Sequence, residues 1–320
     1  MEKRNAIFFA CNQRFLFTLA VALLSLKKNS PKALENSDVL VFYQGFNEQD
    51  KALLNKILPC KFFEYKFAVE TNFDHINFKH FSQLTFARYE IFDMLDTYKK
   101  VLYIDVDVMI GGELNYIFEN YGDKTGVAMC EDTQKGLTLI TKNFVNPMPQ
   151  YDMTLPCYNA GVTLFCDNIK DRQHLKMWCY ERTAEWLDNL VCPDQGVVNV
   201  MFQEFGITVE VLPDICNCLP SNPKYLDKRR KDILIYHCAG GGVRFWTYTW
   251  NAPWQKFYKE YLELGGAPHP DKEHAWLKFI KKYNLQRFRF FDRSPDPQMH
   301  PARFLKYLLI YPFKYAFRKY

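Results

Sequence analysis

The sequence predicts an α/β fold built on a mostly parallel mixed sheet, and two observations carry this prediction. Short apolar segments suited to buried strands alternate along the chain with longer helical patterns. In addition, the apolar segment 101–104 runs directly into the paired acids Asp105 and Asp107. Open α/β sheets bind ligands beyond the carboxyl ends of their strands, so this pair lies where a ligand is expected. The length of 320 residues and the 48% hydrophobic content fit a single large domain with appendages.

The predicted elements follow one another in the alternation that βαβ units require. Strands are predicted at 6–11, 39–43, 101–104, 126–130, 160–166, 208–212 and 233–237, and helices at 15–28, 48–58, 81–95, 173–190 and 195–203. The proline-containing segment 133–157 is expected to be a loop or insertion over one face. The Gly- and Pro-rich segment 265–272 marks the expected boundary between a main domain, 1–264, and a helical basic extension, 265–320.

The apolar N-terminal stretch 6–26 is divided by the polar residues 12–14 into pieces too short to span a bilayer. We therefore expect a strand, a polar loop and a helix there. The ten cysteines are scattered and include no Cys-x-x-Cys pair, which favours buried, reduced thiols of a cytoplasmic protein over a disulfide framework or a zinc site. The close pair Cys216 and Cys218 is interpreted as structural.

The excess positive charge lies at the C-terminal end. Residues 303–320 contain five basic residues and no acid, which equals the formal net charge of +5. These basic residues are mixed with aromatic and aliphatic ones, a composition that favours peripheral binding to an anionic membrane surface, here the cytoplasmic face. The alternative is a terminal helix packed on the core with a solvated basic face. A nucleic-acid partner is not expected, because charges in the remaining chain balance.

The pair Asp105 and Asp107 predicts a divalent-cation site. Residues i and i+2 of an extended strand point to the same side, so both carboxylates can converge where the strand ends. A solvated turn is the alternative interpretation. His237 ends another apolar segment and is followed by glycines from Gly240 onward and by Arg244, a set suited to binding phosphates. Two carboxylates and an imidazole suit Mn²⁺ or Mg²⁺, and ligand type alone leaves zinc open.

Further motifs occur in order within residues 5–255. They are Phe-Ala-Cys-Asn-Gln-Arg-Phe from Phe9, Phe-Ala-Arg-Tyr around Arg88, Tyr-Ile-Asp-Val-Asp from Tyr103, Tyr-Asn-Ala-Gly-Val from Tyr158, Pro-Asp-Gln-Gly from Pro193, and the His237 segment. Together they resemble the retaining glycosyltransferase family that includes glycogenin and the bacterial lipopolysaccharide galactosyl- and glucosyltransferases, glycosyltransferase family 8. The resemblance implies a Rossmann-like nucleotide-diphospho-sugar-binding domain of the GT-A type, UDP-sugar donors and Mn²⁺.

The resemblance also implies roles for single residues. The metal ligands would be Asp105, Asp107 and His237. The donor-binding candidates are Gly240 and Arg244 of the phosphate-binding set, together with Ala10, Asn12, Arg88, Asp105, Asn159 and Ala160. The catalytic candidates are Asp132 and Asp194, which would contact sugar hydroxyls, and Gln195, which would lie near the anomeric carbon. An amide is a poor nucleophile, so we favour front-face departure and attack within an ion pair; double displacement through Asp194 or another acid is the alternative.

The leading functional hypothesis is a retaining, metal-dependent hexosyltransferase. It would move galactose or glucose from a UDP-sugar to a hydroxyl of a glycan or lipid-linked glycan, in lipopolysaccharide or surface-glycan synthesis. Two alternatives stay open: a glycogenin-like protein that glucosylates one of its own tyrosines, and a catalytically silent sugar-nucleotide-binding protein or membrane scaffold. A pure scaffold needs none of Asp105, Asp107, His237 and Gln195.

Overall fold

The computed structural model describes residues 4–71, 82–132, 138–219, 232–239, 244–246 and 252–270. Its strands are β1 (Asn5–Asn12), β2 (Ser37–Gln44), β3 (Cys60–Glu64), β4 (Lys100–Ile104), β5 (Val108–Ile110), β6 (Val127–Glu131), β7 (Tyr158–Cys166), β8 (Glu210–Val211) and β9 (Ile235–His237). The α-helices are α1 (Leu16–Asn29), α2 (Pro31–Glu35), α3 (Glu48–Ile57), α4 (Ile91–Met94), α5 (Asn115–Asn120), α6 (Leu139–Asn143), α7 (Arg172–Glu185), α8 (Pro193–Glu204) and α9 (Ala252–Glu263). Short 3₁₀ helices are η1 (Gln13–Phe15), η3 (Gln83–Glu90), η4 (Leu187–Asn189) and η5 (Asp214–Cys216).

A seven-stranded sheet in the order β3-β2-β1-β4-β7-β6-β8 forms the centre of the molecule. Strands β1, β2, β3 and β4 are mutually parallel, whereas β7 is antiparallel to both β4 and β6. Because β8 is parallel to β6, β7 is the one reversed strand of this sheet. A separate antiparallel pair joins β5 to β9. The predicted mostly parallel mixed sheet is confirmed.

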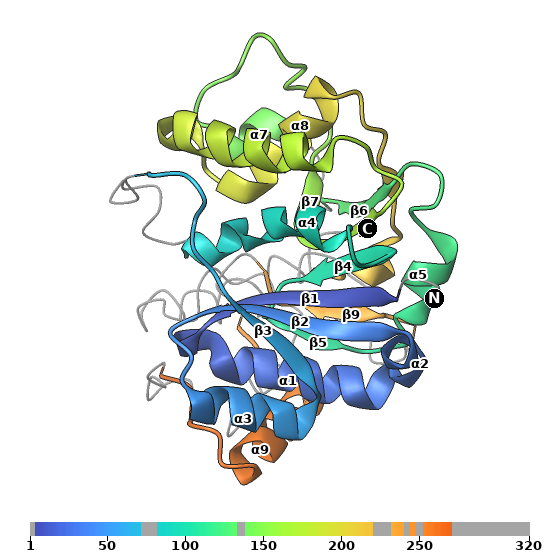
Figure 1. Ribbon diagram of the computed structural model, residues 1–320, viewed down its shortest axis with the longest axis vertical. Coiled ribbons are helices and arrows are strands. Elements are labelled where there is room, and N and C mark those ends of the chain that lie inside the picture. Colours follow the sequence, from blue (N-terminus) through green and yellow to red (C-terminus); the bar gives the residue numbers. More distant parts are fainter. Residues whose placement is uncertain are drawn as a thin grey trace, which may run out of the picture.

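The sheet is buried on both faces, which gives three layers (Figure 1). On β1, Ile7 and Phe9 belong to the core shared with α1, α3 and α9, whereas Phe8 and Ala10 belong to the core shared with α4, α7 and α8. This division follows from the alternation of side chains along a strand. A strand covered on both faces reads as a continuous apolar run, and β1 shows that pattern in the sequence.

The predicted strand, loop and helix at the N-terminus are confirmed as β1, η1 and α1. Every residue of α1 from Leu16 to Leu26 is buried, so its apolar character reflects its place between the sheet and α9. Among the described residues, no helix has the length and hydrophobicity needed to cross a membrane. The next long helix, α3, begins at a capping box in which Asn47 and Asp50 satisfy each other's backbone N–H groups.

Several predicted elements needed correction. Most of the helix expected at 81–95 is 3₁₀ helix η3, and only Ile91–Met94 is α-helical. The segment 133–157 contains α6, so it is not wholly a loop. The predictions missed the edge strand β3, the three-residue strand β5 and the helix α9.

Helix α9 packs on α1 on the side away from the sheet, at the bottom of Figure 1, and ends before the predicted boundary at 265. Trp254, Phe257 and Tyr261 are buried along one side of this helix, at spacings of three and four residues. Gly265, with φ of +95°, follows its end. The division into 1–264 and 265–320 stays a prediction, since residues 271–320, including the basic segment, lie outside the described residues.

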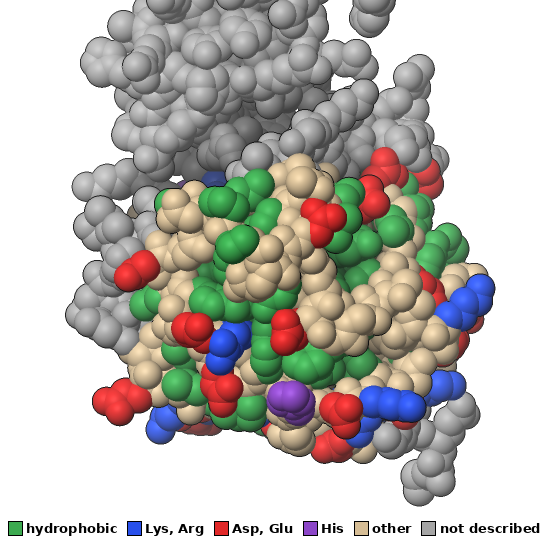
Figure 2. Space-filling view, turned by 90° about the horizontal axis from the view of Figure 1, so that it is seen from above, with side chains coloured by type: hydrophobic (Ala, Val, Ile, Leu, Met, Phe, Trp, Pro, Cys, Tyr) green, Lys and Arg blue, Asp and Glu red, His purple; other side chains and the backbone are tan. Residues whose placement is uncertain are grey.

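All ten cysteines are free thiols, and eight of them are buried, as predicted. The outer face over α7 and α8 is seen in Figure 2, where acidic and basic side chains are scattered among hydrophobic ones. The described part of this face carries no broad basic area.

Candidate active site

The three predicted metal ligands come together at the carboxyl edge of the sheet. Asp105, Asp107 and His237 each offer a ligand atom within 4.8 Å of the others. Asp105 follows β4, and β5 begins directly after Asp107 and pairs antiparallel with β9, so that His237 faces Val108. His237 Nε2 lies 3.1 Å from Asp107 Oδ1 and 3.6 Å from Asp105 Oδ2. The expectation that both acids lie on one extended strand was wrong, because the chain bends at residues 106 and 107 to enter β5.

Electrostatics of these three groups fit a cation site. Burial raises the pKa of Asp105, even though Arg88 and His237 oppose the effect. Burial also acts to raise the pKa of Asp107, but His237 and Arg244 overcome it and hold the pKa at about 2. Burial lowers the pKa of His237, yet the two carboxylates leave it raised above 6.5. Each acid thus lies against a positively charged or hydrogen-bonding partner, Arg88 for Asp105 and Arg244 and His237 for Asp107, and a divalent ion would supply further positive charge.

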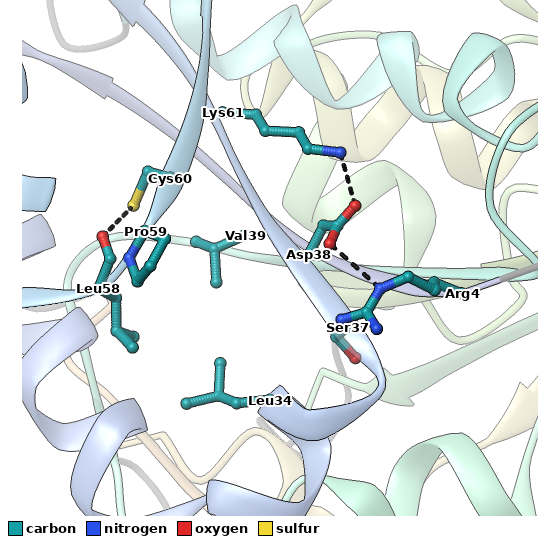
Figure 3. A pocket seen from close by; sticks show the side chains of 9 residues that line it. All are labelled: Arg4, Leu34, Ser37, Asp38, Val39, Leu58, Pro59, Cys60 and Lys61. Carbon is teal, nitrogen blue, oxygen red and sulfur yellow. Dashed lines mark hydrogen bonds and ion pairs between the residues drawn. The ribbon is translucent and has the colours of Figure 1, made fainter.

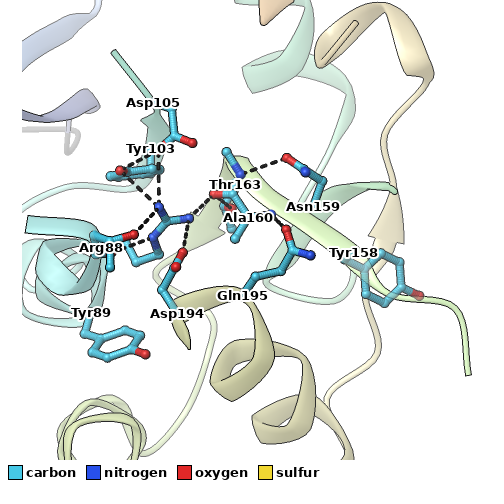
Figure 4. Close-up of polar contacts among 12 residues, drawn as sticks. Arg88, Tyr89, Tyr103, Asp105, Tyr158, Asn159, Ala160, Thr163, Asp194 and Gln195 are labelled. Carbon is cyan, nitrogen blue, oxygen red and sulfur yellow. Dashed lines mark hydrogen bonds and ion pairs between the residues drawn. The ribbon is translucent and has the colours of Figure 1, made fainter. Parts of the chain in front are cut away.

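Arg88 is the centre of a buried network between the metal ligands and helix α8 (Figure 4). Its guanidinium lies 3.2 Å from Asp105 Oδ1 and 2.9 Å from Asp194 Oδ2, and it also donates to the carbonyl oxygen of Ala160. The guanidinium carbon stands 4.5 Å from the ring centroid of Tyr103, whose hydroxyl donates to Asp105 at 2.8 Å. Only 7% of Arg88 is exposed, so these contacts fix the position and orientation of its guanidinium group.

The 3₁₀ geometry of η3 positions Arg88. Side chains at i and i+3 line up in a 3₁₀ helix, and Arg88 Nε donates to the carbonyl oxygen of Thr85 at 2.9 Å. Pairing with Asp194 and Asp105 keeps the guanidinium charged, because these carboxylates raise its pKa against the effect of burial.

The start of α8 presents the remaining catalytic candidates. Pro193 occupies the first turn, where its missing N–H costs nothing. Gln195 accepts from the backbone N–H of Ala160 at 3.2 Å and donates to Asn143 at 3.1 Å. Gln195 is 6% exposed and Asp194 is 4% exposed. Both side chains are therefore held rigidly beside the first residues of β7.

Asn159 connects the remaining polar groups. Its Oδ1 accepts from Gly161 N–H at 3.0 Å and from Asn217 Nδ2 at 2.8 Å, while its Nδ2 lies 3.5 Å from Asp132 Oδ2. Asp132 follows β6, and its backbone N–H donates to the carbonyl oxygen of Cys157. The structure thus brings Asp132, Asn159, Asp194 and Gln195 to the same edge as the metal ligands.

The structure describes three of the four residues expected near the nucleoside and the diphosphate, namely Ala10, Asn12 and Arg244. Ala10 is buried near the end of β1, and Asn12 ends that strand. The Oδ1 atom of Asn12 is buried and has no hydrogen-bond partner among the described residues, which fits an acceptor for a ligand donor. Arg244 Nη1 donates to Asp107 Oδ2 at 2.8 Å, next to the metal ligands. Gly240 lies outside the described residues.

Sequence reasoning missed several residues of this site. Tyr103, Asn143 and Asn217 each bond directly to a predicted site residue. Asn217 had a recognisable signal, because a polar amide between two buried cysteines in an apolar segment needs a buried partner. Gly161 also matters: a Cβ there would lie 2.2 Å from His237 Cε1.

A different cavity, of about 300 Å³, lies at the opposite edge of the sheet (Figure 3). Its lining comes from the amino ends of β1, β2 and β3. The charged groups around it pair with one another, since Asp38 binds Arg4 at 3.2 Å and Lys61 at 2.7 Å. Because parallel strands carry the predicted ligands at their carboxyl ends, this cavity is separate from the candidate site.

Comparison with known proteins agrees with this geometry. The family model for glycosyl transferase family 8 matches residues 6–249. A Haemophilus influenzae protein named "Putative glycosyltransferase" is 22% identical over 259 residues, which cover 75% of this chain and 72% of that protein. The structure of galactosyltransferase LgtC with donor and acceptor sugar analogs aligns with a TM-score of 0.62 and 20% identity, over 82% of this chain and 97% of that one. The WbbM bifunctional glycosyltransferase aligns with a TM-score of 0.61 and 17% identity, over 88% and 52%. The structural likeness establishes a shared fold and confirms the predicted GT-A type.

Proposed function

The chain belongs to glycosyltransferase family 8, and from this premise we propose that it is a retaining, metal-dependent hexosyltransferase. The donor in this proposal is a UDP-sugar carrying galactose or glucose. The acceptor is a hydroxyl of a glycan or lipid-linked glycan in lipopolysaccharide or surface-glycan synthesis. Enzyme activity as a glycosyltransferase follows from the family, whereas the sugar, the nucleotide and the acceptor are parts of the proposal.

One observation carries the proposal. Asp105, Asp107 and His237 converge within 4.8 Å at the edge of the sheet where the buried Arg88, Asp194 and Gln195 also meet. Two carboxylates and one imidazole suit Mn²⁺ or Mg²⁺, and a bound divalent cation would neutralise charge developing on a departing diphosphate. The three ligand groups are buried or partly buried and lie against one another, so a bound cation would also offset the repulsion between the two carboxylates.

The donor is expected to lie across this edge. Asn12 Oδ1 has no hydrogen-bond partner within the described part of the chain, so it suits an N–H or O–H donor of the nucleoside. Arg244 is partly exposed and lies against Asp107, so its guanidinium group can turn from Asp107 to donate to a diphosphate oxygen. Asp132 and Asn159 offer an acceptor and a donor to sugar hydroxyls.

The polar contacts favour front-face departure and attack within an ion pair. Asp194, the acid nearest Gln195 in the sequence, is committed to a buried ion pair with Arg88 at 2.9 Å. A carboxylate held in this way is a weaker nucleophile than a free one. Gln195 keeps its amide bonded to Ala160 and Asn143, which suits electrostatic support of the sugar ring rather than covalent attack.

We also propose that residues 303–320 hold the protein peripherally at the cytoplasmic face of a membrane, near a lipid-linked acceptor. The support is the sequence alone, which combines five basic residues with aromatic ones and contains no acid.

The test is donor hydrolysis without an acceptor. UDP release is followed from a panel of UDP-sugars with Mn²⁺, Mg²⁺ or EDTA. We expect metal-dependent release from UDP-galactose or UDP-glucose. A ladder of added hexose masses on the protein itself would favour the self-glucosylating alternative, and absence of both turnover and nucleotide binding would favour the silent scaffold.

Asp107→Asn is the first variant, and Asp38→Asn is its matched control. Both remove one carboxylate charge, but Asp38 lies at the opposite edge of the sheet, beside Arg4 and Lys61 (Figure 3). We expect Asp107→Asn to lose at least about tenfold in metal-dependent turnover, because even the loss of a hydrogen-bond partner of a metal ligand costs that much, while Asp38→Asn retains it. Unchanged turnover in Asp107→Asn with an intact fold would contradict the metal assignment.

A further inference from the structure

We infer that Asn217 is a positioning residue that fixes the metal-binding tautomer of His237 and ties it to the sugar-facing Asn159. The inference deepens the proposed function, on whose metal site it rests. Asn217 follows η5 and its side chain touches both residues. Its Nδ2 lies 2.8 Å from Asn159 Oδ1, and its Oδ1 lies 2.8 Å from His237 Nδ1.

The orientation of these amides follows from a backbone group that can only donate. Gly161 N–H lies 3.0 Å from the Asn159 side-chain atom that accepts it, so that atom is oxygen. The Asn217 atom facing the same oxygen must then be its NH₂ group, since two oxygens would repel. This leaves Asn217 Oδ1 opposite His237 Nδ1, which carries a hydrogen and donates it. Whichever charge His237 has, its Nδ1 keeps that hydrogen and its Nε2 is the atom turned toward the acids.

The metal site needs this arrangement. Nε2 lies 3.1 Å from Asp107 Oδ1 and 3.6 Å from Asp105 Oδ2, so it is the ligand atom. In metal sites, the second imidazole nitrogen commonly donates to a carbonyl or carboxylate, which sets the ring orientation and the basicity of the ligand nitrogen. Asn217 supplies that acceptor here, from a side chain that is only 1% exposed.

The backbone holds Asn217 in place. His237 N–H donates to the carbonyl oxygen of Cys218 at 3.0 Å, and Cys218 N–H donates to that of Ile235 at 2.9 Å. Cys216 and Cys218 are both buried in the core on either side of Asn217. The cysteines therefore do have the structural role predicted for them, and the amide between them is aimed at the site.

The second contact of the Asn217 side chain is made by its Nδ2 group, which binds Asn159, the residue expected to face the sugar. With Oδ1 of Asn159 occupied by Gly161 and Asn217, the Nδ2 group of Asn159 is the part turned toward Asp132. The positions of His237 and Asn159 are thus linked through one buried side chain. Metal coordination and sugar positioning share this element.

Two variants separate the hydrogen bond of Asn217 with His237 from its hydrogen bond with Asn159. Asn217→Ala removes both, and Asn217→Asp keeps an acceptor for His237 but replaces the donor to Asn159 with a second oxygen. Mn²⁺ is titrated into the metal-free full-length protein, and free Mn²⁺ is followed by electron paramagnetic resonance. We expect Asn217→Ala to weaken Mn²⁺ binding about 10- to 100-fold, the range found for lost partners of metal-bound histidines. We expect Asn217→Asp to keep Mn²⁺ affinity within about threefold or to tighten it, while sugar release from the donor falls about tenfold or more in kcat.

Cys216→Ala is the control, because it perturbs the same segment from the core side. It is expected to lower the melting temperature without changing Mn²⁺ affinity. Equal Mn²⁺ affinity in wild type and a folded Asn217→Ala variant overturns the inference and leaves the proposed function standing. A loss of Mn²⁺ affinity of about tenfold or more in a folded Asn217→Asp variant, relative to wild type, also overturns it, and this second comparison preserves the test if Asn217→Ala does not fold. A wild-type protein that binds neither Mn²⁺ nor Mg²⁺ refutes the metal-dependent function itself.

Discussion

Gly161→Ala is expected to disrupt the metal site by steric means alone. A Cβ at position 161 would lie 2.2 Å from His237 Cε1 and 2.8 Å from Asp105 Oδ2. Ordinary van der Waals contact begins near 3.4 Å, so the imidazole would have to retreat by about 1.2 Å. His237 is 1% exposed and hydrogen-bonded through both ring nitrogens, so such a movement would break contacts of the site. Misplacement by about 1 Å costs on the order of 100-fold in function, and overpacking costs about 1–3 kcal/mol of stability.

The assay is Mn²⁺ titration together with chemical denaturation, with Gly206→Ala as the control. Gly206 has φ of +60°, and a Cβ added there would have nothing within 4 Å, so alanine costs about 1 kcal/mol of backbone strain without touching the site. We expect Gly161→Ala to lose about 100-fold in Mn²⁺ affinity, about 2.8 kcal/mol, and Gly206→Ala to lose stability only. Mn²⁺ affinity within twofold of wild type in Gly161→Ala would refute the steric reasoning.

Three further predictions concern stability. Arg88→Ala leaves Asp105 and Asp194 without their shared cation and should lower the free energy of unfolding by about 3 kcal/mol in urea denaturation; a loss below about 1 kcal/mol would contradict the network. Trp254→Ala, at a fully buried position of α9, should cost about 3–5 kcal/mol while Mn²⁺ affinity stays unchanged. Burial raises the pKa of Glu113, but hydrogen bonds from Ser30 and three backbone N–H groups lower it below 4.5 overall. The stabilisation by the Glu113 carboxylate is therefore complete above pH 4.5 and is lost as the pH falls through the lower pKa of the folded state. The difference in free energy of unfolding between wild type and Glu113→Gln should shrink as the pH falls, and a difference independent of pH would contradict this role of the carboxylate.

The sheet could be predicted because its strands are buried on both faces. Continuous apolar runs such as 6–11 and 101–104 are typical of strands that are covered on both faces, and these two segments form β1 and β4. Parallel strands also direct their carboxyl ends to one edge, which is why acids after β4 could be expected to meet a ligand. Strand β3 escaped prediction because it is an edge strand with partly exposed residues, and β5 because three residues carry no period.

The candidate site was predictable as a set of residues and not as a set of contacts. Asp105 and His237 are separated by more than 130 residues, and only the β5–β9 pairing brings them together. The ion pair of Arg88 with Asp194 depends on the 3₁₀ winding of η3, which local helical patterns do not distinguish from an α-helix. Tyr103 lies within a motif and Asn217 lies between two buried cysteines, but the hydrogen bonds of their side chains depend on packing between distant segments, which the sequence does not show.

Because β7 runs against its neighbours, its first residues lie beside the carboxyl end of β4. Asn159 and Ala160 are therefore fixed by the pairing of β7 with β6 and β4, and not by the chain that precedes them. That preceding chain, from 138 to 157, contacts the site through Asn143 of α6, which accepts from Gln195, and through the carbonyl oxygen of Cys157, which accepts from Asp132 N–H. A replacement segment that keeps Asn143 would leave the register of the sheet untouched, so changes in the surroundings of the site are best introduced in this connection rather than in the strands.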